Sequence, residues 1–154
     1  MKIVKGKEEG VKQFKPEFVK QVPKAPAYLN TRAKKYFKEV AQVLIDAERL
    51  KNIYLETLAI LADNLSQKEW AIREMSAMNR NKPGSGYKQK YNTGATNITT
   101  EMVVKRDAEK RILECLAVFG MDPKSDKQLG QKDSGQYELF EMLEKKMQGN
   151  QMVS

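Results

Sequence analysis

The sequence predicts a mainly α-helical protein: a small helical body of three main helices, an extended N-terminal arm and a C-terminal amphipathic helix. Apolar residues recur at helical spacing over three long stretches, and residue types that begin or end helices lie at their boundaries. One basic segment without helical spacing separates the second stretch from the third. The expected divisions are an arm (residues 1–27), a helical domain (28–129) and a tail (130–154).

The arm is rich in lysine, and its three prolines interrupt any long helix: Pro16, Pro23 and Pro26. Seven lysines and three glutamates give it a positive balance. We expect an extended or partly disordered basic segment. Its lysines either contact phosphate groups or only keep the terminus soluble.

The first helix is expected to begin near Asn30 or Thr31, since either side chain can cap it. Its buried stripe follows at helical spacing and consists of Ala33, Phe37, Val40, Leu44 and Ala47. The opposite face carries Lys34, Lys35 and Lys38. Such a face either follows a phosphate backbone or is an ordinary solvated surface.

The second helix is expected from a cap at Asn52 through about Met78. Its apolar stripe consists of Tyr54, Leu58, Leu61, Ala62, Leu65 and Ile72. Apolar residues outside that stripe indicate a helix at the centre of the monomer or one shared with a neighbour, and we expect subunit contacts at Ile53, Ile60 and Trp70. Glu69 falls inside the stripe, where Arg73 is one turn away and can form an ion pair with it.

Residues 79–97 interrupt the helices and form the most concentrated positive segment. There is no acidic residue between Glu74 and Glu101, and the segment contributes Arg80, Lys82, Lys88 and Lys90. Tyr87 and Tyr91 alternate with the last two lysines, which indicates a flexible loop or a short hairpin. Aromatic rings interleaved with lysines can bind a nucleic-acid strand, although an ordinary loop has the same composition.

The third helix is expected over residues 98–119, with Ile98 at its first position and an apolar stripe that continues to Phe119. Gly120 supplies the left-handed residue that ends it. Asp122-Pro123 then prevents the helix from resuming, and a second short helix is expected to open at Ser125.

The tail contains an amphipathic segment over residues 136–147. One face carries Tyr137, Phe140, Leu143 and Met147, and Glu141 lies one turn before Lys145. Twelve residues form a marginal helix in isolation, so this segment needs a packing partner. That partner is the body, a sister subunit or another protein.

Composition favours polyanion binding over catalysis. The formal net charge is +8, histidine is absent, and the one cysteine, Cys115, borders an apolar stripe. These facts exclude His/Cys zinc sites and His-based catalytic sets, and we expect no cofactor and no metal. Gly84-Ser85-Gly86 lacks the following Gly-Lys-Ser/Thr of a phosphate-binding loop. Neither a secretory signal nor an apolar run of membrane-spanning length is expected.

Two blocks of sequence resemble the small subunit of the phage terminase, the DNA-packaging motor. One reads Ala-Tyr-Leu-Asn followed by Ala-Lys-Lys-Tyr-Phe-Lys-Glu-Val, and the other runs over residues 97–129. The likeness spans roughly residues 26–129 and rests on the order and spacing of the blocks. One departure is Ile98, because the family commonly places proline after the asparagine at position 97.

The resemblance implies a non-enzymatic helical protein in the host cell cytoplasm. Such subunits form rings, bind viral double-stranded DNA at a packaging start site and regulate the large subunit, which holds the ATPase and nuclease. It also implies that residues 130–154, with Tyr137, Phe140, Leu143 and Met147, dock on the large subunit. The alternative is a helical adaptor that binds another protein through its C-terminal helix and does not recognise DNA.

Overall fold

The computed structural model describes residues 15–124 and 136–151. The helices are α1 (Thr31–Asp46), the short 3-10 helix η1 (Asn52–Tyr54), α2 (Leu55–Asn81), α3 (Thr100–Val118) and α5 (Gln136–Gln151). Two short strands, β1 (Lys88–Lys90) and β2 (Thr96–Ile98), come after α2 and before α3 in the chain. The predicted mainly α-helical class is therefore confirmed.

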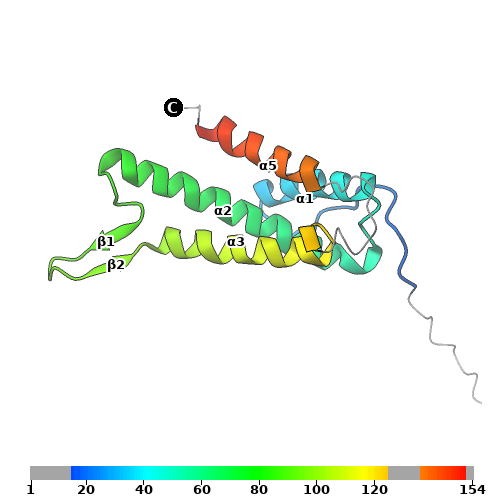
Figure 1. The fold of residues 1–154 in the computed structure, drawn as a ribbon, viewed down its shortest axis with the longest axis horizontal. Coiled ribbons are helices and arrows are strands. Elements are labelled where there is room, and N and C mark those ends of the chain that lie inside the picture. Colours follow the sequence, from blue (N-terminus) through cyan, green and yellow to red (C-terminus); the bar gives the residue numbers. More distant parts are fainter. Residues whose placement is uncertain (1–14, 125–135, 152–154) are drawn as a thin grey trace, which may run out of the picture.

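The helix α2 occupies the centre of the arrangement. It packs along α3 and also against α1, and α5 packs against α1 (Figure 1). The β1–β2 hairpin extends beyond one end of the α2–α3 pair, away from α1. The apolar core lies where the helices meet, and its largest fully buried side chains include Phe37, Leu44, Leu58, Leu61 and Leu116.

Two predicted helix boundaries are confirmed in atomic detail. The Asn30 side chain caps α1, because its Oδ1 accepts the Ala33 N–H at 2.8 Å. At the end of α3, Gly120 adopts φ +67°. The Met121 N–H then donates to the Leu116 carbonyl at 2.8 Å, and Met121 is itself buried.

The expected cap at Asn52 is wrong. Helix α2 begins at Leu55 and continues to Asn81, past the expected end at Met78. The Asn52 Oδ1 instead accepts the Glu17 N–H at 3.1 Å, and the Asn52 N–H donates to the Glu17 carbonyl at 2.9 Å. Together with an antiparallel bridge between Phe18 and Lys51, these bonds hold the described part of the predicted arm along residues 50–52.

The expected start of the third helix at Ile98 is also wrong. Ile98 belongs to β2, and α3 begins at Thr100 with Thr99 as its cap, whose Oγ1 accepts the Met102 N–H at 3.2 Å. Near the other end of α3, the chain is already helical at Pro123, ahead of the expected start at Ser125. Proline fits a first helical turn because that turn needs no N–H from it. Ser125 itself lies outside the described residues.

The partner of the C-terminal helix is the body. Leu139 is 1% exposed and Leu143 is 8% exposed, both within the main core cluster. The Lys146 ammonium pairs with Glu39 of α1 and lies 4.5 Å from the centre of the Tyr36 ring. The expected pair between Glu141 and Lys145 is present at 2.8 Å.

Candidate nucleic-acid interface

The basic segment folds as a hairpin, one of the two forms its sequence allowed. Strands β1 and β2 are antiparallel, with Lys88 opposite Ile98 and Lys90 opposite Thr96. The Tyr91 N–H donates to the Ala95 carbonyl at 2.9 Å, and Gly94 turns the chain with φ +84°. All side chains of both strands are exposed, so the hairpin offers them to a ligand.

The base of the hairpin is fastened to both long helices through Gly86. Its N–H donates to the Asn79 Oδ1 at 2.8 Å, and its carbonyl accepts the hydroxyl of Thr99 at 2.7 Å. A Cβ at Gly86 would lie 2.5 Å from the Met75 carbonyl oxygen, so only glycine fits this close approach. Sequence reasoning missed the positioning roles of Asn79, Gly86 and Thr99, since none of them has a pattern of its own.

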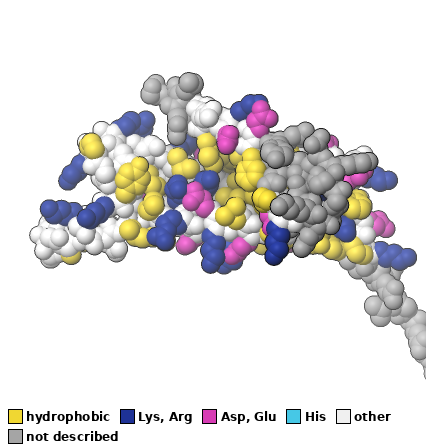
Figure 2. Space-filling view, viewed as in Figure 1, with side chains coloured by type: hydrophobic (Ala, Val, Ile, Leu, Met, Phe, Trp, Pro, Cys, Tyr) yellow, Lys and Arg dark blue, Asp and Glu magenta, His cyan; other side chains and the backbone are white. Residues whose placement is uncertain are grey.

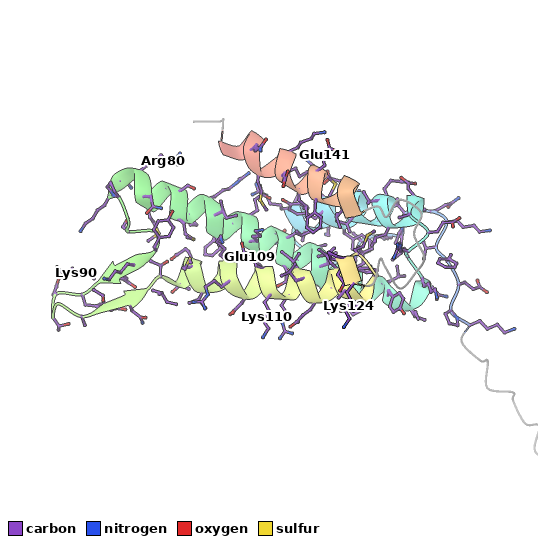
Figure 3. All side chains as sticks on the ribbon, viewed as in Figure 1. Arg80, Lys90, Glu109, Lys110, Lys124 and Glu141 are labelled. Atoms are coloured by element: carbon purple, nitrogen blue, oxygen red, sulfur yellow. The ribbon has the colours of Figure 1, made fainter. Side chains whose placement is uncertain are left out.

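The predicted cations of this segment gather at one end of the molecule. Arg80 lies in the last turn of α2 and Lys90 on the hairpin, both at the end away from α1 (Figure 3). The side chains of Arg80, Lys82, Lys88 and Lys90 are exposed, and none forms an ion pair with a described residue. On the face shown in Figure 2, this end carries Lys and Arg side chains without acidic neighbours. We call these four residues the basic end.

Two exposed aromatic rings accompany the basic end. Tyr87 is 55% exposed and Tyr91 is 46% exposed, and they border β1 on either side. Rings held next to cations on an extended strand can pack against sugars or bases while the cations meet phosphates.

The lysines predicted on the first helix form a separate surface. Lys35 and Lys38 are exposed and Lys34 is half-buried, all on α1 and apart from the hairpin. The structure therefore does not join them to the basic end.

The buried carboxylate of Glu69 has a structural role. The predicted ion pair with Arg73 is confirmed at 2.9 Å, and Arg32 adds a second at 3.0 Å. The Tyr36 hydroxyl donates to Glu69 at 3.0 Å, and burial together with the Glu69 charge raises the pKa of Tyr36. The group thus ties α1 to α2 by satisfied contacts.

Cys115 is a buried residue of the core, and burial raises the pKa of its thiol. A high pKa disfavours the reactive thiolate. Within residues 15–124 and 136–151, no cluster of metal-ligating side chains is present.

Comparison with models of protein families identifies the family of this chain. A model of the phage terminase small subunit matches residues 33–136. The chain belongs to the phage terminase small-subunit family. Comparison with curated proteins and with solved structures gave no match.

Family membership gives this small subunit a role in phage DNA packaging. Terminase small subunits are generally non-catalytic. No described helix combines the length and apolar character needed to cross a membrane.

The residues expected at subunit contacts are on the surface of this small subunit. Ile53 is 41% exposed, Ile60 is 44% exposed and Trp70 is 46% exposed. Exposed apolar side chains of this size are available to a partner. Their role in assembly stays a prediction.

The residues expected to contact the large subunit divide between surface and core. Phe140 is 38% exposed, and Met147 is half-buried. Leu143 is in the core and is not available in this conformation, because the α5 face that carries it packs on the body. The side chain of Tyr137 lies outside the described part of the structure.

Proposed function

We propose that this protein is the non-catalytic DNA-recognising subunit of a packaging motor, binding viral double-stranded DNA at the start of packaging through its basic end. It works as an oligomeric ring and regulates the large ATPase and nuclease subunit. The observation that carries the DNA-binding proposal is a set of four exposed cations, two on the anchored hairpin and two at its root, that form no ion pair with a described residue.

The shape of the hairpin supports duplex binding. A two-stranded β-ribbon is one of the elements that the major groove of B-DNA admits. Lys88 and Lys90 lie on β1, which can enter the groove, whereas Arg80 and Lys82 lie at the root of the hairpin, where phosphates would pass. The base bonds of Gly86 fix the ribbon relative to α2 and α3, so that little order has to be gained on binding.

The body and the tail supply surfaces for the other two roles. Ile53, Ile60 and Trp70 are exposed apolar residues suited to contacts between subunits. Phe140 and Met147 remain partly accessible on α5, which makes this helix our candidate for docking on the large subunit. Both assignments rest on the family together with the exposure of these side chains.

A salt titration of DNA binding tests the basic end. If its four cations each neutralise one phosphate, the plot of log affinity against log salt has a slope of about −3.6 from this end alone. Replacing Arg80, Lys82, Lys88 and Lys90 with glutamine should weaken binding at low salt and make the slope shallower by about that amount.

A variant with Lys34, Lys35 and Lys38 replaced by glutamine is the control, because it also removes surface charge but leaves the hairpin intact. It should bind DNA nearly as well as the original chain. Loss of binding in this control with full binding by the hairpin variant would move the contact to α1. A slope unaffected by either change would refute the electrostatic argument.

A further inference from the structure

The outward faces of α2 and α3 carry matching patterns of opposite charge. On α2 the pattern is Ile60, Asp63, Gln67 and Trp70. We call these four residues, together with Glu56 and Glu74, the acidic stripe. On α3 the pattern is Val103, Arg106, Lys110 and Leu113, which we call the basic stripe. Both repeat at intervals of three, four and three residues, the spacing that keeps side chains on one side of a helix.

The apolar members of both stripes are exposed. Ile60 and Trp70 are 44% and 46% exposed on α2, and Val103 and Leu113 are 38% and 62% exposed on α3. In each helix the two apolar residues are ten positions apart, roughly 15 Å along the axis. Two helices could therefore lie side by side with both apolar contacts formed at once.

The charged members lie between or beside these apolar contacts. Arg106, Lys110 and Glu74 are exposed and form no ion pair with any residue that the structure describes. If the helices run parallel, Asp63 faces Arg106, and if they run antiparallel it faces Lys110. Asp63 is half-buried and accepts a hydrogen bond from the Gln67 amide at 2.7 Å, which leaves its charge in place, so opposite charges face each other in both directions.

The two stripes cannot meet within one chain. The α2–α3 contact uses other faces, which bury Ala71 and Met75 of α2 and Ala108 of α3. Lys68 of α2 pairs across this contact with Glu109 at 3.5 Å, whereas Lys110 points away from α2 (Figure 3). A partner for either stripe must come from another molecule.

The geometry points to a second copy of this chain as that partner, with the acidic stripe of one copy packed on the basic stripe of the next. This inference rests on the proposed ring and specifies its contact. The two surfaces differ, so the contact is heterologous, and repeated heterologous contacts form a ring when the rotation from one copy to the next closes. DNA is a poor occupant, because the acidic stripe repels it, and Asp107 and Glu114 flank the cations of the basic stripe on α3.

Charge reversal on one stripe at a time tests the contact. Arg106→Glu with Lys110→Glu makes the basic stripe acidic, and Asp63→Lys with Glu74→Lys makes the acidic stripe basic. Light scattering without DNA should show an oligomer for the original chain and a mass near 17.6 kDa for each variant alone. An equimolar mixture of the two variants should assemble again into an oligomer in which they alternate, because each then offers the charge that the other needs.

A matched control reverses two cations outside both stripes, Lys35→Glu with Lys38→Glu, and should stay oligomeric. Circular dichroism checks that each variant is folded. An oligomer that survives the α3 reversal would indicate a contact between identical α2 faces and overturn the inference. Single-chain mass for the original protein, or no recovery on mixing, would overturn it as well.

The same variants separate this inference from the proposed function. DNA binding is measured on the hairpin variant, whose stripes are intact, and assembly is measured without DNA. Loss of DNA binding by the α3 reversal with no change in mass would assign the basic stripe to DNA and refute the subunit contact, while leaving the basic end to its own test.

Discussion

The helical body and the hairpin end use their cations in different ways. In the body, Arg32 and Arg73 pair with the buried Glu69, and Lys68 and Lys105 pair with Glu109. At the hairpin end, the four cations of the basic end have no described carboxylate partner. Two of these pairs in the body, Arg32 with Glu69 and Lys68 with Glu109, join one helix to another, whereas the cations of the basic end remain available to a ligand. Changes to the body should affect stability, and changes to the hairpin should affect binding.

The largest expected effect comes from removing α5. Deletion of residues 136–154 takes Leu139 and Leu143 out of the core, and burial of each leucine contributes about 1.5–3 kcal/mol. We expect the free energy of unfolding to fall by about 3–6 kcal/mol in a urea titration. The shorter deletion of residues 148–154 removes no residue of the core cluster and should have a small effect. Equal stability of the two truncated chains would show that α5 is not part of the body.

The C-terminal helix α5 shows which features of the fold can be predicted from the sequence and which cannot. The spacing of Leu143 and Met147 predicts an amphipathic helix, and the pair between Glu141 and Lys145 is present. The pattern states that a face will be buried but not against what. The residues that α5 meets are far away in sequence: Glu39 and Tyr36 lie about a hundred residues from Lys146 and contact it only in the fold.

Helix ends show the same division between local and distant causes. The cap at Asn30 and the stop at Gly120 were predictable because their bonds stay within one turn of the helix. Asn52 has an equally good side chain for capping, but its amide bonds residues 15 and 17 instead. The sequence around Ile98 predicts a helix start, because no residue next to it indicates its pairing with Lys88.

The positive charge of the basic end could be predicted from the sequence, but the contacts that anchor its hairpin could not. Its four cations stand out in the sequence because no acidic residue lies near them. The anchoring of the hairpin depends on the close approach of Gly86 to Met75 and Asn79, which no spacing rule encodes.

The next largest effect is expected at Glu69. Glu69→Ala leaves the buried Tyr36 hydroxyl without its acceptor and removes the carboxylate that pairs with both Arg32 and Arg73. Because both arginine side chains are more than a third exposed, solvent screens part of the loss, and we expect about 2 kcal/mol of destabilisation by chemical unfolding. Ser76→Ala, an exposed change on the same helix outside the acidic stripe, should remain within about 0.5 kcal/mol. Similar losses for both variants would mean that Glu69 has no special role.

A smaller effect on stability is expected at the joint between body and hairpin. Gly86→Ala forces a Cβ to within 2.5 Å of the Met75 carbonyl, so the hairpin must shift at its base. We expect about 1 kcal/mol of destabilisation, together with weaker DNA binding, because the ribbon loses its orientation. Gly94→Asn at the hairpin tip is the control, since nothing lies within 4 Å and asparagine tolerates the left-handed backbone there. Unchanged DNA affinity for Gly86→Ala would show that the anchoring does not position the ribbon.

The smallest effect on stability is expected from the basic end itself. Replacing Arg80, Lys82, Lys88 and Lys90 with glutamine removes exposed side chains that support no described ion pair, so the free energy of unfolding should change by less than about 0.5 kcal/mol. The urea midpoint and the slope of the transition should both be preserved, while DNA affinity falls. A marked loss of stability would show that these cations belong to the body after all. The contrast with Glu69 would then disappear, because both regions would be using charge to hold the fold.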